Sequence, residues 1–174
     1  MLLFAAISCL GCDPGGEDEN KDKLPAFDYS PEPSEDLSLK DYDRVIFDRF
    51  QLFPGVKEQK LALEFPEQIY HKMNYHYPNA FKDVRLWSYD MPGLLVTGVI
   101  VEYNPVSRLK RLIPSGRGTA VFGVEVVLRD NLSNREISSF SMRTPFRRPD
   151  LDIDNVMDQT AKDIAGYLAA SRGR

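Results

Sequence analysis

A strand with one wholly apolar face most constrains the fold of this chain. Residues 119–129 read TAVFGVEVVLR, and one alternating set in this run is entirely apolar: Ala120, Phe122, Val124, Val126 and Leu128. Alternate side chains of a strand lie on the same face of a sheet, so this set predicts a face that packs on a core. Residues 130–134 (DNLSN), of which four are polar, predict a turn, and residues 135–143 predict the returning strand of a hairpin.

Three other runs predict strands. Residues 94–103 (LLVTGVIVEY) are apolar on both alternating sets, which predicts a strand in a central, buried position. Residues 43–53 predict a first strand that Pro54 and Gly55 close, and residues 82–89 predict a short second strand.

Two segments have helical periodicity. Within residues 58–77, Ile69, Met73 and Tyr77 recur at a spacing of four, and Pro66 predicts a helix start or break near Phe65. The second helix follows a cap at Asp152 or Asp154, and its apolar stripe comprises Val156 or Met157, Thr160, Ile164 and Leu168. Together these elements predict an α+β two-layer sandwich, with a mixed or mainly antiparallel sheet of about five strands backed by two helices.

Composition narrows the class of protein. The chain has 174 residues and a formal net charge of −4. This length suits one domain, and an acidic balance argues against a nucleic-acid partner. Residues 1–39 hold nine acidic and two basic side chains, whereas residues 40–174 hold seventeen acidic and twenty basic ones. The acidity therefore lies in the amino-terminal part.

The first twelve residues, MLLFAAISCLGC, carry no charge, and an acidic segment rich in proline and glycine begins directly after Cys12. This pattern resembles a bacterial lipoprotein signal, which implies that the Cys12 thiol receives a lipid, with Cys9 as the alternative. No Lys or Arg precedes the apolar run, so we allow for a start upstream. A redox or zinc role for the two cysteines is the other interpretation, but the chain has no other cysteine and only two histidines.

The charge pattern divides the chain into three parts. Residues 1–12 form the signal segment, residues 13–39 are expected to be a disordered acidic tether, and residues 40–174 a single α+β domain. The alternative for the tether is that part of it, such as residues 24–29, packs on the domain.

Residues 96–144 resemble the bacterial domain-of-unknown-function 4410 family, whose members are typically lipoproteins. The matching positions are Gly98, Arg108, Arg111, Gly116, Gly118, Val124, Val126 and Asp130. In the turn, Asn134 stands where the family has a glycine. The resemblance implies a small envelope protein with a sheet backed by two helices, and similar shapes serve secretion and surface assembly.

The candidate site is a basic loop between two strands. It contains the partner-binding or anion-binding candidates Arg108, Lys110, Arg111, Gly116, Arg117 and Gly118. The alternatives are a solvated charged loop and, for the Gly-x-Gly sequence, a simple turn. His71 and His76 are five residues apart, about 140° around a helix, so we expect no metal site there.

No catalytic motif and no cofactor motif is found in the sequence. We therefore expect a lipid-anchored, non-enzymatic lipoprotein domain of the cell envelope, facing the periplasm, that binds a partner protein or a surface glycan. One alternative is an envelope hydrolase with an unrecognised active site. Another is a soluble cytoplasmic protein whose amino terminus is apolar by chance.

Overall fold

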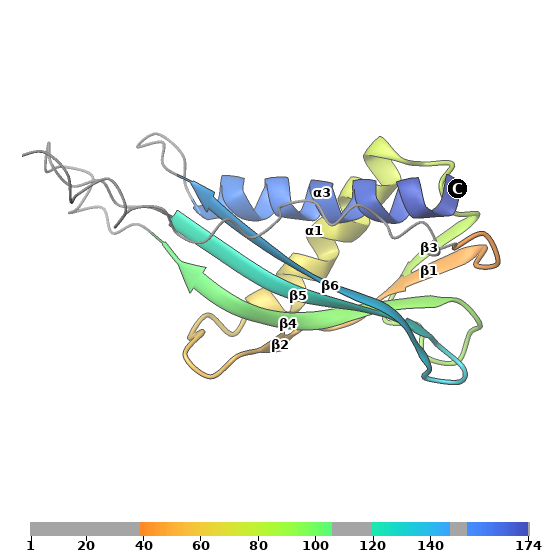
Figure 1. Cartoon of the computed structure of the whole chain (residues 1–174), viewed down its shortest axis with the longest axis horizontal. Coiled ribbons are helices and arrows are strands. Elements are labelled where there is room, and N and C mark those ends of the chain that lie inside the picture. Colours follow the sequence, from red (N-terminus) through yellow and green to blue (C-terminus); the bar gives the residue numbers. More distant parts are fainter. Residues whose placement is uncertain (1–38, 106–119, 147–152, 174) are drawn as a thin grey trace, which may run out of the picture.

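The computed structural model describes residues 39–105, 120–146 and 153–173. Its elements are β1 (Arg44–Phe47), β2 (Gln51–Leu52), α1 (Leu61–His76), β3 (Asp83–Leu86), β4 (Leu94–Asn104), β5 (Ala120–Asp130), β6 (Glu136–Phe146) and α3 (Ile153–Gly173). The two helices pack on each other and on the sheet, as Figure 1 shows. The predicted α+β sandwich is confirmed.

The sheet is mixed. Its strand order is β3-β1-β4-β5-β6, and the two-residue β2 pairs with β4 beyond the end of β1. Strand β1 pairs in parallel with β3 and with β4, and β2 pairs in parallel with β4. The pairs β4–β5 and β5–β6 are antiparallel. The predicted central position of β4 is confirmed, but the strand is buried on one face only: Leu94, Val96, Gly98 and Ile100 are buried, whereas the residues between them are half-buried.

The core lies between the sheet and the helices. Phe122, Val124, Val126 and Leu128 of β5 have no exposed surface, which confirms the predicted apolar face. The helical stripes meet this face with their equally buried side chains: Ile69, Met73, Val156, Ile164 and Leu168.

Position 98 of β4 requires a glycine, because neighbouring atoms lie too close to leave room for a Cβ. A Cβ at this position would lie 2.1 Å from the Glu125 carbonyl oxygen and 2.6 Å from the ring of Phe50. The Phe50 ring also meets Phe65 of α1 edge-on, with centroids 5.5 Å apart. The glycine therefore allows an aromatic ring to lie directly on the sheet.

The prediction of one continuous first strand over residues 43–53 is wrong. The strand is interrupted at residues 48–50, between β1 and β2. Asp48 Oδ1 accepts a hydrogen bond from the amide of Arg49 over 2.6 Å. The amide of Phe50 turns toward α1 and donates to the Ala62 carbonyl oxygen over 3.0 Å.

The predicted helix start or break near Phe65 is also wrong. Helix α1 begins at Leu61 and continues through Pro66. A proline has no N–H, so it leaves the carbonyl four residues earlier without its helical donor. That carbonyl belongs to Ala62, and the Phe50 amide supplies the missing donor. A tertiary hydrogen bond thus makes the interior proline compatible with the helix.

Two residues with positive φ end elements of the sheet. Asn134 has φ 55° in the turn between β5 and β6, which explains why an asparagine can replace a glycine there. Trp87 has φ 57° and ends β3. The side chain of Asn131 donates to the Met91 carbonyl over 2.6 Å, so the hairpin turn is joined to the loop after β3.

The first described residues lie against the carboxyl-terminal end of α3. Leu39 is fully buried, and its amide donates to the Ser171 carbonyl oxygen over 3.2 Å. The guanidinium of Arg172 donates to the Lys40 carbonyl and forms an ion pair with Asp43. Among the described residues, no helix is both long and apolar enough to cross a bilayer.

Candidate functional site

The sequence-predicted site residues lie outside the described residues. This applies to Cys9 and Cys12 and to the whole basic set: Arg108, Lys110, Arg111, Gly116, Arg117 and Gly118. The structure does show that β4 and β5, which the basic segment connects, are antiparallel neighbours. His71 and His76 are both exposed on α1. In the described ranges, no group of three or more His, Cys, Asp or Glu side chains could hold a metal ion.

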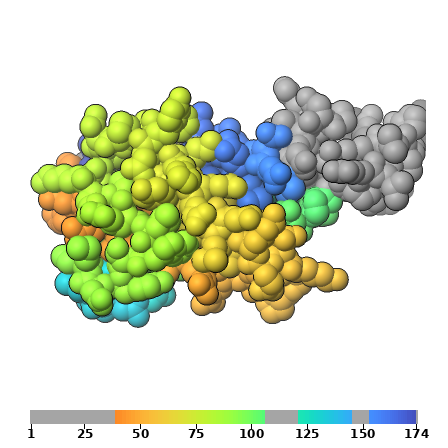
Figure 2. All heavy atoms as spheres, turned by 180° about the vertical axis from the view of Figure 1, so that it is seen from behind, coloured from red at the N-terminus to blue at the C-terminus, as the bar shows by residue number. Residues whose placement is uncertain are grey.

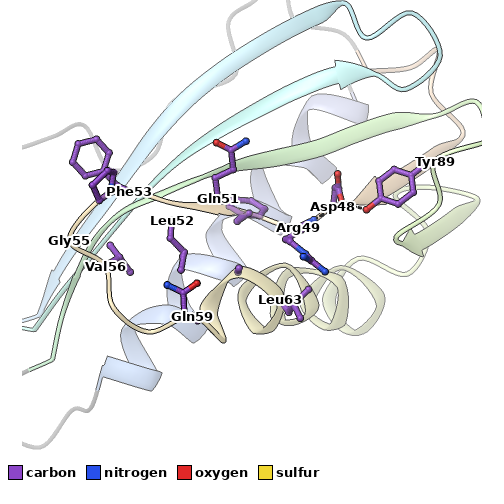
Figure 3. A pocket seen from close by; sticks show the side chains of 13 residues that line it. Asp48, Arg49, Gln51, Leu52, Phe53, Gly55, Val56, Gln59, Leu63 and Tyr89 are labelled. Carbon is purple, nitrogen blue, oxygen red and sulfur yellow. Dashed lines mark hydrogen bonds between the residues drawn. The ribbon is translucent and has the colours of Figure 1, made fainter.

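A groove of about 850 Å³ lies between the segment from Asp48 to Val56 and the start of α1, where Gln59, Ala62 and Leu63 line it. Figure 3 shows its side chains, with Tyr89 at one end and Phe53 at the other. In Figure 2 the segment around residues 50–60, coloured gold, protrudes beside α1 in yellow. The segment that forms one wall of the groove is therefore at the surface of the molecule.

The backbone of β2 directs hydrogen-bonding groups toward one side of this groove. The amides of Asp48 and Phe53 donate to the Val96 and Ile100 carbonyl oxygens of β4. Peptide groups alternate along a strand, so the N–H and C=O of Leu52 point away from β4. Leu52 lines the groove. A segment that lies in the groove can bond to these groups as an added strand does.

The rim of the groove combines apolar and aromatic side chains with the exposed polar side chains of Arg49, Gln51 and Gln59. Phe53, Leu63 and Tyr89 are 54%, 40% and 57% exposed. Neither sequence periodicity nor a motif identified this site, because its walls come from segments far apart in the chain.

The Tyr89 hydroxyl donates to Asp48 Oδ1 over 2.5 Å, as Figure 3 shows. This hydrogen bond, together with burial and the negative charge of Asp48, raises the pKa of Tyr89. The tyrosine thus stays protonated, and its bond joins the loop after β3 to the end of β1. The pair fixes one end of the groove.

The chemistry of the groove suits binding. Its lining includes one carboxylate, from Asp48, and no Ser, Cys, His or Lys side chain. General acid–base catalysis uses a group whose pKa lies near the working pH, and nucleophilic catalysis needs an activated side chain. Serine, cysteine, histidine and lysine, which often act as nucleophiles or bases, are absent from the described lining of the groove.

A second cavity of about 470 Å³ contains several carboxylates, among them Asp43, Asp83 and Asp130. Hydrogen bonds from Lys82 and Arg44 lower the pKa of Asp43 and of Asp83, respectively. The Asp130 pKa is also lowered, first by the amide of Ser133 in its own turn. These groups are held as anions by structural partners, which does not suit a general acid.

An ion pair crosses the open face of the sheet. Arg143 of β6 donates through Nε to Glu102 of β4 over 2.6 Å. The two residues flank Gly123 of β5 in register, so the side chains meet over a position without a Cβ. A Cβ on Gly123 would lie 3.1 Å from the Cβ of Glu102. This pair therefore ties three strands together.

Comparisons with known proteins show the fold. No family model matches the chain, and no curated protein matches it. PelC from Paraburkholderia phytofirmans, solved as a dodecamer, has a TM-score of 0.57 at 13% identity over 80% of this chain and 92% of that chain. Protein XCC0632 from Xanthomonas campestris, of the domain-of-unknown-function 330 family, has a TM-score of 0.51 at 8% identity over 80% and 90%.

Lower-scoring structures include a minor lipoprotein from Acinetobacter baumannii, with a TM-score of 0.39 at 11% identity over 74% of this chain and 94% of that chain. Proteins described as lipoproteins are thus among the structural neighbours. The first two structures establish the shared fold.

Proposed function

We propose that this chain is a lipid-anchored, non-enzymatic lipoprotein of the cell envelope, and that its folded domain binds a partner protein. The observation that carries the anchor is the abrupt change at Cys12, from an uncharged apolar segment to an acidic one. The resemblance to the domain-of-unknown-function 4410 family and the lipoproteins among the structural neighbours support the same proposal.

The anchor is tested by metabolic labelling with a palmitate analogue. Cys12→Ser should abolish the label and release the protein from the membrane fraction, whereas Cys9→Ser is the matched control and should label fully. Labelling that depends on Cys9 would move the anchor to that residue. An unlabelled wild-type protein would overturn the proposal of a lipoprotein.

The partner-binding part of the proposal rests on the groove. Its open Leu52 backbone groups and its rim at Phe53 and Leu63 suit an extended segment of another protein with an apolar side chain. The basic residues Arg108 and Arg111 would add attraction for an acidic partner.

A photo-crosslinking side chain at Phe53 tests the groove in intact cells. The proposal expects a discrete crosslinked product, and Tyr75, which is 82% exposed and does not line the groove, is the matched control position. Equal crosslinking from both positions would indicate collision rather than binding. No product from Phe53 would exclude the groove.

The basic segment has a separate test. Reversing Arg108 and Arg111 to Glu should leave the free energy of unfolding within about 0.5 kcal/mol, as for most surface changes. The yield of the Phe53 product should fall, and the difference from wild type should shrink at high salt. An unchanged yield at every salt concentration would show that these arginines do not contact the partner.

The alternative of an envelope hydrolase predicts a cavity with two carboxylates whose pKa values differ strongly. In the described part of the chain, the only carboxyl with a raised pKa is Asp163 of α3, and burial is its main cause. Asp163 lines neither of the two cavities described above. The observations therefore favour the binding function.

A further inference from the structure

The two edges of the sheet are built differently. The edge strand β3 has four residues, and its Asp83 is held by Arg44 and Arg85. Short, charged edge strands are a common protection against pairing with other chains. The opposite edge strand, β6, has eleven residues, and within the described ranges no strand pairs with its outer side.

The bonding pattern across the sheet shows which groups of β6 point outward. Val96 and Ile100 of β4 accept bonds from the β1–β2 side, so the odd-numbered residues of β4 point to β5. Val99 is one of them and is in register with Glu125 of β5, so the even-numbered Val124 and Val126 point to β6.

The same alternation continues into β6. Val124 and Val126 are in register with Met142 and Phe140, whose backbone groups therefore bond to β5. The N–H and C=O groups of Ser139 and Ser141 consequently point away from the sheet, and both serines are exposed. The position of Pro145 supports this, because a proline in an edge strand turns its nitrogen, which has no proton, outward.

The available stretch of this edge is symmetric about Ser141. The ladder with β5 is irregular at Ile137, which is four residues before Ser141. Pro145, which cannot donate, is four residues after it. An edge that ends at equal distances on both sides of one residue matches an identical edge related by a two-fold axis through that residue.

We propose that the β6 edge pairs with β6 of a second copy of this chain, antiparallel, about a two-fold axis at Ser141. In this register Phe140 of one copy lies opposite Met142 of the other on the helix-bearing face. On the open face Ser141 lies opposite Ser141, and Ser139 lies opposite Arg143. No two like charges face each other, and the apolar pairs extend the core across the junction.

The chain's own amino-terminal segment is a poorer occupant. Residues 24–38 contain Pro25, Pro31 and Pro33, which cannot donate to a ladder, and four acidic side chains. The β6 edge of a second copy has no proline and no acidic side chain between residues 138 and 144. The inference concerns a different surface from the groove and does not depend on the proposed partner.

Cysteine crosslinking tests the register. In the full chain with Cys9→Ser and Cys12→Ser, Ser141→Cys should form a disulfide-linked dimer under mild oxidation, because paired Cα atoms at the axis are about 5.5 Å apart. Ser139→Cys is the matched control, since the axis separates its two copies by about 13 Å along the strands. Equal crosslinking of both variants, or of neither, would overturn the proposal.

A second variant tests whether the β6 edge forms the dimer, without relying on a disulfide bond. Ser141→Pro removes an outward N–H, so sedimentation should show loss of the dimer, while the thermal midpoint of the chain at low concentration stays unchanged. A wild-type chain that is monomeric at all concentrations would overturn the proposal. So would a dimer that Ser141→Pro leaves intact.

Discussion

Pro66 in the middle of α1 gives a sharp test of how the helix is tied to the sheet. Ala is about 3 kcal/mol more favourable than Pro in a helix interior, so Pro66→Ala would strongly stabilise an isolated helix. In this fold the Ala62 carbonyl already accepts from the Phe50 amide over 3.0 Å. An alanine at position 66 would bring a second donor to the same oxygen.

Two losses offset the gain in helix propensity. Phe50 is 1% exposed, and sharing its acceptor weakens the hydrogen bond of its amide, at a cost of up to the about 1–3 kcal/mol of a buried donor that loses its acceptor. The ring of Pro66 is itself buried, and its replacement by a methyl group removes two carbons worth about 0.8 kcal/mol each. We therefore expect Pro66→Ala to change the free energy of unfolding by no more than about 1.5 kcal/mol in either direction.

Urea unfolding measures the net effect, and amide hydrogen exchange measures its cause. The Phe50 amide should be protected in the wild type and should exchange about tenfold faster in Pro66→Ala, because its acceptor is shared. Pro54→Ala is the control, since Pro54 lies outside the helices and reports the change in unfolded-chain entropy alone. If Pro66→Ala stabilised the chain by about 3 kcal/mol and left the exchange rate of the Phe50 amide unchanged, the proposed role of the Phe50 amide in compensating for Pro66 would be refuted.

Three further predictions use the same unfolding assay. Gly98→Ala should destabilise by about 3 kcal/mol, because its Cβ would overlap the Glu125 carbonyl, whereas Gly173→Ala, with nothing within 4 Å, should be nearly neutral. Asn134→Ala should cost about 1 kcal/mol at its positive φ, and Asn134→Gly should cost less than half of that. The pKa values of the Asp43 and Asp83 carboxyls are lowered in the fold, so their stabilisation should be complete above pH about 4 and fall as the pH drops further; a urea midpoint independent of pH between about 5 and 3 would contradict this.

Local patterns in the sequence were sufficient to predict which faces of the strands and helices form the core. The apolar alternation through Val124 and Val126 and the helical spacing of Ile164 and Leu168 each determine a buried face, because each face depends only on residues close in the chain. The turn at Asn134 was also visible, because only a few residue types adopt positive φ at low cost.

Features that depend on distant partners were not predictable. The run from Val45 to Phe53 reads as one strand, and its interruption follows from the bond between Phe50 and Ala62. Pro66 reads as a helix start for the same reason, since the donor that compensates it belongs to another element. The groove likewise requires the β1–β2 segment, α1 and Tyr89 to meet, and periodicity carries no information about such a meeting.

The groove and the β6 edge lie on opposite sides of the sheet. Segment β2 borders β4 on one side, while β5 and β6 follow on the other, so a partner in the groove and a second copy at β6 do not compete for the same strand. In the proposed dimer the two grooves lie at the two far sides of one continuous sheet. A partner with two such segments would then bind the dimer with higher affinity, because the second segment binds at a high effective concentration. Ser141→Pro would lower the affinity for that partner without changing any residue of the groove. A partner with a single segment would bind Ser141→Pro and wild type equally, so the comparison separates the contribution of dimerisation from that of the groove itself.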